Sequence, residues 1–252
     1  MIKCYLAIVA LLFCSNILLA QDNPPAWGGG ADQRDLSFGF SFSYIENYYK
    51  ILKKPNWQTP FPDPQNGNQP VTSAGTSISS PNTPGFAVGF LTRYDFTEHF
   101  EVRLTPSLIF ADRSLSYTYA DTTDNVKKIV QTTTVDFPLA IKIKSDRHGD
   151  FRGYFVAGLK YSYSIGAKAN SDNTAALVDR TVKNVGSYES YEAGVGCDIY
   201  FEYFKLSPEI KISNSFGNVL LPEAQPYSSP ISKLFLHSLM INLYFEELVK
   251  KN

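Results

Sequence analysis

Apolar and polar residues alternate along much of the chain with a period of two, the spacing of an extended strand with one apolar face. The stretch 193–216 shows this most clearly. Apolar residues hold the odd positions from Ala193 to Tyr203, and small or charged residues hold most of the even ones. The parity restarts after Phe204 and Lys205, which leaves room only for a tight turn. The stretch therefore predicts a hairpin with its turn at 204–205.

The same alternation recurs along the rest of the chain. A change of parity between Phe110 and Leu115 indicates a bulge within one long strand. With the two strands of the hairpin, the pattern predicts about eight strands, the number in the smallest common barrel. The further stretches that predict strands are 36–44, 86–96, 100–119, 134–144, 152–165 and 235–246.

The connections between these strands differ in length in a regular way. Long polar connections at 48–84, 120–126, 167–187 and 217–232 alternate with short ones at 97–99, 145–150 and 204–205. Outer-membrane barrels have long loops outside and short turns in the periplasm, and aromatic residues gather near the strand ends here as in their interfacial girdles. We therefore expect residues 36–246 to form an all-β, eight-stranded antiparallel transmembrane barrel.

The ends of the chain predict export. Residues 1–20 contain one basic residue, Lys3, and a short apolar core, and are typical of a signal peptide cleaved after Ala20. A lipoprotein signal ending at Cys14 fits less well, because bulky Phe13 precedes that cysteine. Residues 21–35 are rich in Gly, Pro and Asp and predict a flexible periplasmic lead-in, and residues 247–252 form a C-terminal tail. The expected location is the outer membrane of a Gram-negative bacterium.

Removal of the signal peptide changes the charge and cysteine content. Without Lys3 the chain has 22 basic and 24 acidic residues, a net charge of −2, and Cys197 is its one remaining cysteine. A single cysteine forms no internal disulfide, and a near-neutral charge argues against a nucleic-acid partner.

Charged residues share the face of the strands opposite to the apolar one. In a transmembrane barrel they would fill a narrow lumen and balance one another, whereas a Lys or Arg facing lipid would cost about 2–4 kcal/mol at mid-membrane. A soluble barrel with its apolar face inward would place the small residues of 37–43, 194 and 196 in water, where they gain nothing. The predicted lumen network, structural in role, contains Arg93, Glu101, Arg103, Asp136, Lys142, Arg152, Lys160, Glu192, Asp198, Glu202, Glu209 and Lys211.

Candidate catalytic and metal-binding groups are few. His99, His148 and His237 lack metal-ligand spacing, so we expect no metal site and no cofactor. Asp198 and Glu202 share one strand face and could suggest paired carboxylates, but no nucleophile motif or convergent histidine accompanies them. The interpretation of a structural ion-pair network is preferred, and the chain is not expected to be an enzyme.

Four stretches resemble the PorT family, also called SprT, whose members are outer-membrane β-barrel components of the type IX secretion system. The resemblance runs from Gly28 to Glu246, leaves the loops 60–84 and 167–187 unmatched, and brings no catalytic residues. The stretches are PGFAVGFLTRY (84–94), EVRLTPSLIFADRSLSYTY (101–119), IKIKSDR (141–147) and GVGCDIYFEYFKLSPEIKISNSFGNVL (194–220).

The resemblance implies a non-enzymatic outer-membrane protein needed for export of proteases and adhesins and linked to gliding motility. Its partners would be the lipid bilayer and other type IX secretion components. A lumen packed with charged side chains is too narrow for folded cargo, so an accessory or assembly role is expected and not that of the main pore. The alternatives are a lipocalin-like ligand-binding barrel and an outer-membrane hydrolase.

Overall fold

The computed structural model describes residues 35–130, 132–165 and 176–247. The predicted signal peptide 1–20, the lead-in up to residue 34 and the tail from residue 248 lie outside this range. The described chain is all-β apart from one short 3-10 turn, η2 (Thr122–Asp124). No helix in these three ranges is long and apolar enough to cross a membrane.

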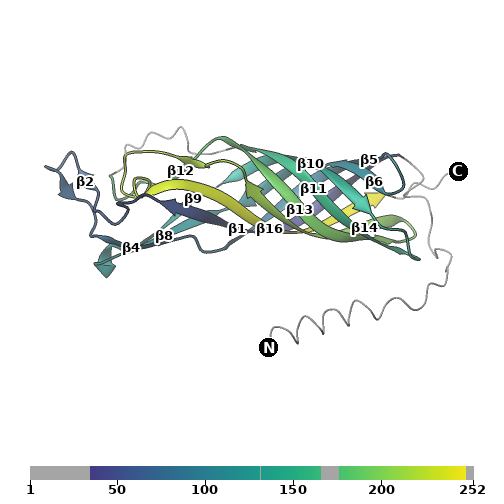
Figure 1. The fold of residues 1–252 in the computed structure, drawn as a ribbon, viewed down its shortest axis with the longest axis horizontal. Coiled ribbons are helices and arrows are strands. Elements are labelled where there is room, and N and C mark those ends of the chain that lie inside the picture. The colour runs from purple at the N-terminus through teal and green to yellow at the C-terminus, as the bar shows by residue number, and fades with distance from the viewer. Residues whose placement is uncertain (1–34, 131, 166–175, 248–252) are drawn as a thin grey trace, which may run out of the picture.

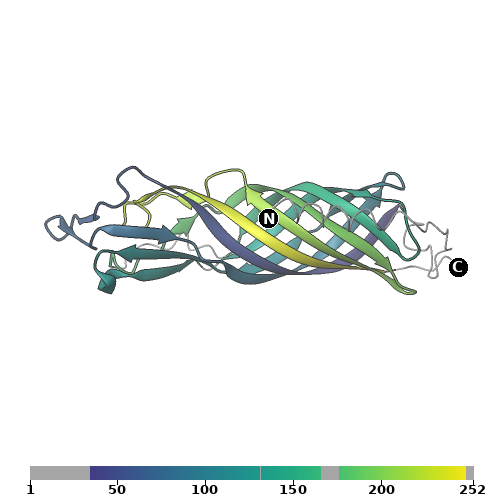
Figure 2. The same cartoon turned by 60° about the horizontal axis from the view of Figure 1, so that its bottom comes forward.

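Eight antiparallel strand positions close into a barrel (Figures 1 and 2), as the alternation predicted. β1 closes the ring because it pairs with β16 on one side and β5 on the other. β6 and β7 share one position and are separated by Thr105 and Pro106, where the ladder is interrupted. The barrel strands are β1 (Leu36–Lys53), β5 (Thr83–Asp95), β6 (Phe100–Leu104) with β7 (Ser107–Ala111), β10 (Thr133–Lys144), β11 (Phe151–Ser164), β13 (Ser187–Tyr200), β14 (Phe204–Ser215) and β16 (Ile231–Glu247).

The two faces of the strands separate as the alternation predicted. Large apolar side chains cover the outside, and Phe90 and Phe155 are 75% and 68% exposed. Small residues face inward where another chain segment comes close. A Cβ on Gly196 would lie 2.5 Å from the Tyr154 hydroxyl oxygen, so only glycine leaves room for that ring. Gly196 therefore admits the large polar side chain of Tyr154 from the neighbouring strand.

The hairpin turn predicted at 204–205 lies instead at Phe201–Tyr203. Tyr200 pairs with Lys205 in the β13–β14 ladder, and the Phe201 amide donates to the Phe204 carbonyl at 2.9 Å. The prediction was wrong here because no Gly, Pro or Asn marks the turn, and because the ammonium of Lys205 points inward to the carboxylate of Glu246 at 3.0 Å. Phe201 and Tyr203 therefore belong to the turn and not to β13, which ends at Tyr200.

The strands continue past the barrel at the long-loop end (Figure 1). β1 runs on to Lys53, inside the segment 48–84 that was predicted to be loop. β8 begins after Asp112, where the parity change had indicated a bulge, and it lies between β4 and β9 in a three-stranded sheet. The elements of this extension are β2 (Pro62–Asp63), β3 (Gln69–Pro70), β4 (Gly75–Ser79), β8 (Arg113–Tyr119), β9 (Val126–Val130), β12 (Lys183–Asn184) and β15 (Leu220–Leu221).

Candidate functional site: the barrel interior

Eleven of the twelve residues predicted to line the lumen are buried, each with at most 5% of its surface exposed. The exception is Glu202, which lies exposed in the turn between β13 and β14. Its assignment to the lumen followed from extending β13 past Tyr200, and it is corrected by the position of the turn. Arg152 is buried at the short-turn mouth, where its Nε donates to the Ser145 carbonyl at 2.7 Å and a guanidinium nitrogen lies 3.7 Å from Glu98.

At the short-turn end, ion pairs join the last strand of the barrel, β16, to β5 and β14. Glu246 on β16 accepts from Arg93 on β5, and its other oxygen lies 3.0 Å from the ammonium of Lys205. Arg93 also pairs with Asp95. Lys144 contacts Asp95 as well and lies 3.5 Å from Glu101, which connects this group to the layer above.

In the middle of the barrel, Asp198 and Glu101 hold the central cations. Both carboxylate oxygens of Asp198 lie 2.8 Å from the Lys142 ammonium, and the Ser207 hydroxyl donates to Asp198 at 2.6 Å. Glu101 lies 3.2 Å from the guanidinium of Arg103 and 3.7 Å from Lys142. Each buried charge thus faces an opposite one, which offsets the large cost of removing it from water.

Glu209 is the most highly connected group in the interior. Its carboxylate accepts from the guanidinium of Arg103 at 3.2 Å, from the hydroxyls of Tyr154 and Tyr244 at 3.1 and 3.2 Å, and from the Asn242 amide at 3.1 Å. These donors come from β6, β11 and β16, while Glu209 lies on β14. One carboxylate therefore connects strands from opposite parts of the ring.

The layer nearest the long loops is built on Glu192. Its two oxygens lie 2.9 Å from the ammonium of Lys211 and 3.2 Å from that of Lys160. Lys160 also lies 3.1 Å from Asp136. The network therefore extends through the barrel from Glu246 to Asp136, on strands whose register places these residues at successive heights.

Four charged residues of this network are absent from the predicted list of lumen residues. Lys144 and Glu246 have the same parity as inward residues of their own strands, so the alternation could have found them. Lys205 had been assigned to the turn. Asp95, at the end of β5, has the parity of inward Arg93, so the alternation places it on the polar face as well.

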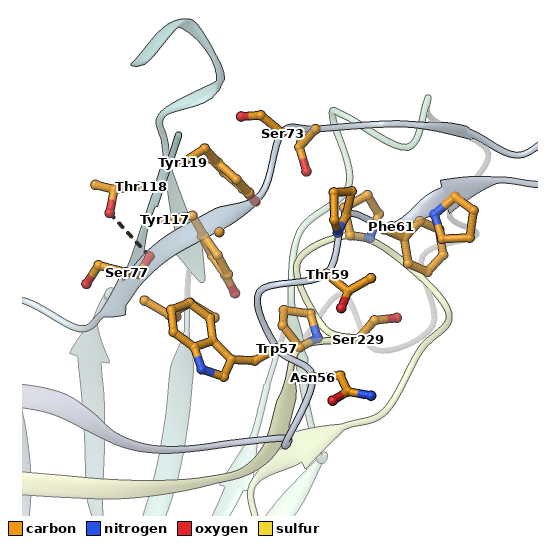
Figure 3. Close-up of a pocket in the computed structure, with 17 residues that line it drawn as sticks. Asn56, Trp57, Thr59, Phe61, Ser73, Ser77, Tyr117, Thr118, Tyr119 and Ser229 are labelled. Atoms are coloured by element: carbon orange, nitrogen blue, oxygen red, sulfur yellow. Dashed lines mark hydrogen bonds between the residues drawn. The ribbon is translucent and has the colours of Figure 1, made fainter. Parts of the chain in front are cut away.

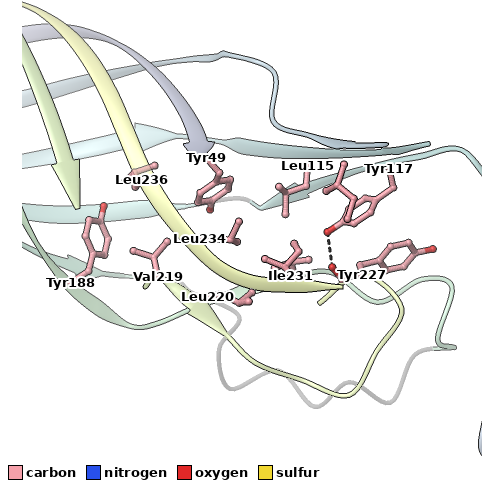
Figure 4. Close-up of a cluster of buried hydrophobic side chains, with 12 residues drawn as sticks. Tyr49, Leu115, Tyr117, Tyr188, Val219, Leu220, Tyr227, Ile231, Leu234 and Leu236 are labelled. Atoms are coloured by element: carbon pink, nitrogen blue, oxygen red, sulfur yellow. Dashed lines mark hydrogen bonds between the residues drawn. The ribbon is translucent and has the colours of Figure 1, made fainter. Parts of the chain in front are cut away.

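An apolar cluster closes the interior at the long-loop end (Figure 4). Leu115, Val219 and Leu234 have no exposed surface, and the Tyr117 hydroxyl donates to the Tyr227 carbonyl at 2.6 Å. We call this group the apolar cap. It consists of Tyr49, Ile78, Leu115, Tyr117, Val182, Tyr188, Val219, Leu220, Tyr227, Ile231, Leu234 and Leu236.

Arg113 lies where the apolar cap meets the polar interior. One of its guanidinium nitrogens donates to the Tyr188 hydroxyl at 3.0 Å, and the guanidinium lies 6.0 Å from the centre of the Tyr49 ring. The cation therefore rests between two aromatic side chains, an arrangement that stabilises a desolvated guanidinium. The interior is packed by long polar side chains below Arg113 and by apolar ones above it.

The described residues do not bring together the groups of a hydrolytic site. Asp198 is bound to Lys142 and Ser207 inside the barrel, whereas Glu202 lies in the external turn. Within the described ranges, no cluster of three or more His, Cys, Asp or Glu residues could hold a metal ion. The geometry is that of a packed interior, and eight strands enclose just enough space for side chains to fill.

A family model described as "Outer membrane protein beta-barrel domain" matches residues 20–221. No curated protein sequence matches the chain. Among solved structures, OprG from Pseudomonas aeruginosa aligns at 11% identity with a TM-score of 0.43, over 84% of this chain and 94% of OprG. Neisserial surface protein A aligns at 7% identity and a TM-score of 0.43, over 86% of this chain and 100% of that one. AlkL aligns at 14% identity and a TM-score of 0.40, over 92% and 97%.

Proposed function

The chain belongs to the outer membrane protein beta-barrel domain family, and from that premise we propose that it is an accessory component of the type IX secretion system. It is an eight-stranded barrel of the Gram-negative outer membrane. In the proposed role it has no enzymatic activity and acts by contact with other secretion components. The resemblance of 84–94, 101–119, 141–147 and 194–220 to the PorT family supports this choice of system.

The observation that carries the accessory role is the filled interior. Glu209 alone holds donors from three other strands, and the apolar cap packs the space above the ion pairs. Passage of a polypeptide would require many buried charge pairs to separate, and breaking one such pair costs about 3–5 kcal/mol. A component that the secretion system needs, but that does not conduct the cargo, fits this interior.

The contact with partners is proposed to lie at the long-loop end. The turn between β2 and β3 projects there, beyond the barrel strands (Figure 1), and Gln65 on that turn is exposed. Lys127 on β9 is exposed on the same extension. A photocrosslinking amino acid at either position should capture a defined secretion component in cells, while one at Glu98 on the opposite end should not capture the same component.

The function is tested by deleting the gene and restoring it. Deletion should leave type IX cargo in the periplasm, while resistance to large antibiotics and detergent stays near the wild-type level, because a closed barrel contributes little to bulk permeability. The purified protein in planar bilayers should give no large steady current. Normal cargo release after deletion would refute the secretion role, and a large steady current would refute the accessory one.

Site-specific labelling gives an independent measure of the filled interior. Cysteine placed at Ser207, which is fully buried, should react with a bulky aqueous maleimide far more slowly than cysteine at exposed Gln65. The native Cys197 is replaced by serine for this measurement. Equal rates at the two positions would indicate an open lumen.

A further inference from the structure

A cavity of about 120 Å³ lies in the extension at the long-loop end, above the apolar cap (Figure 3). Its walls come from four separate segments, which include residues 56–62, 72–78, 117–119 and 226–230. This volume is comparable to cavities that hold one six-membered ring. The cavity is therefore large enough for one ring of a ligand and too small for an acyl chain or a folded segment.

The walls combine aromatic rings with neutral hydrogen-bonding groups. Trp57, Phe61 and Tyr119 supply rings, and no Asp, Glu, Lys, Arg or His is among the lining residues. Trp57 is held in place, because the Lys53 ammonium lies 4.0 Å from the centre of its ring and Gly75 packs against its edge. The absence of charge in these walls disfavours phosphate, carboxylate and ammonium ligands.

Hydroxyl and amide groups lie around the rings. The side chains of Asn56, Thr59 and Ser229 line the cavity (Figure 3) and have no hydrogen-bond partner among the described residues. The Tyr119 hydroxyl is hydrogen-bonded to the Thr72 side chain, which also lines the cavity, and burial raises the pKa of Tyr119 to about 12. Hydroxyls around an aromatic wall match a ligand that has hydroxyls at its edge and C–H groups on its face.

We propose that this cavity binds one neutral pyranose ring of a glycan. An extended peptide would need a longer groove or a free ladder edge, whereas a single ring with several hydroxyls fits the size and the neutral polar walls. The inference is independent of the secretion role, since it rests on the cavity alone. The sugar could belong to lipopolysaccharide of the same membrane or to a glycan outside the cell.

The test uses Trp57 as the reporter. The chain has two tryptophans, and Trp27→Phe leaves Trp57 as the one that emits. The full mature protein in lipid vesicles is titrated with methyl glycosides of glucose, galactose, mannose and N-acetylglucosamine. At least one of these glycosides should change the Trp57 emission in a saturable way, with a dissociation constant of about 1–10 mM, as expected for a single small ring.

Two cavity variants and one matched control decide whether the signal comes from this site. Phe61→Ala should weaken binding about tenfold, and Thr59→Val about threefold to tenfold, since each removes one contact with the ring. Phe96→Ala, an exposed phenylalanine at the opposite end of the barrel, should leave binding unchanged. All variants are compared at equal folded fraction.

The outcomes separate the classes of ligand and the source of the sugar. Lipopolysaccharide in the vesicles should compete with the free glycoside if the bound sugar comes from the same membrane, and should not compete if it comes from outside. The proposal is overturned if no glycoside gives a saturable change, if Phe96→Ala weakens binding as much as Phe61→Ala, or if a hexaproline peptide saturates the signal and the glycosides do not.

Discussion

Replacing Glu209 by glutamine tests whether the interior network holds the barrel together. Gln keeps the size of the side chain but only one accepting oxygen, so one of the hydroxyls of Tyr154 and Tyr244, which donate to different oxygens of Glu209, can still donate. The change removes the negative charge that lies 3.2 Å from the guanidinium of Arg103. A pair of unit charges about 4 Å apart contributes about 4 kcal/mol at an effective dielectric constant of about 20.

Arg103 retains one partner in this variant, the carboxylate of Glu101 at 3.2 Å, which reduces the loss. We therefore expect the free energy of unfolding to fall by about 3 kcal/mol, at the lower end of the range for breaking a buried pair. The matched control is Glu202→Gln in the exposed turn, which should change it by less than about 0.5 kcal/mol.

The assay is reversible urea unfolding in lipid vesicles, followed by Trp57 emission in a Trp27→Phe background and by the gel mobility of the folded barrel. A double variant with Arg103→Met should recover part of the loss, because it removes the cation that Glu209→Gln leaves short of a partner. The reasoning is refuted if Glu209→Gln is no more destabilising than Glu202→Gln, or if the double variant loses the full sum of the two single changes.

Three further changes probe the outer face, the apolar cap and the loops. Ile210→Arg, on an outward side chain that is 54% exposed, should cost about 2–4 kcal/mol and lower the yield of folded barrel in vesicles; a normal yield would argue against a lipid-facing position. Leu234→Ala truncates a fully buried side chain of the apolar cap and should lower the free energy of unfolding by about 2–5 kcal/mol. The rate of proteolysis at the long-loop end should rise, and an unchanged rate would contradict the packing of Leu234 in the apolar cap. The backbone amide and hydroxyl of Thr123 hold the pKa of Asp121 below its usual value, so NMR titration should show that Thr123→Ala raises it. Any stabilisation from Asp121 is then present above its unfolded pKa of about 4 and is lost as the pH falls through the folded value. Because alanine keeps the backbone amide, a pKa unmoved by Thr123→Ala would rule out only the hydroxyl as a cause.

The alternation along the chain was enough to determine the class of fold and the facing of most side chains. The alternation depends only on the local geometry of a strand, because successive side chains point to opposite sides whatever the partner strand is. Residues such as Lys142 and Ile210 could therefore be assigned to the inside and the outside correctly, and the lengths of the connections indicated which end of the barrel carries the loops.

The tertiary structure alone decided which charges meet and where the strands end. Glu209 contacts Arg103 and Tyr154 because the registers of their strands place the three side chains at the same height in the barrel. The register between strands distant in sequence cannot be deduced from the local alternation of residues. The inward pairing of Lys205 with Glu246, 41 positions apart in sequence, draws Lys205 into the strand and places Glu202 outside. The apolar cap and the cavity above it assemble from four or more distant segments whose composition resembles ordinary loop, because each segment is stabilised only by the others.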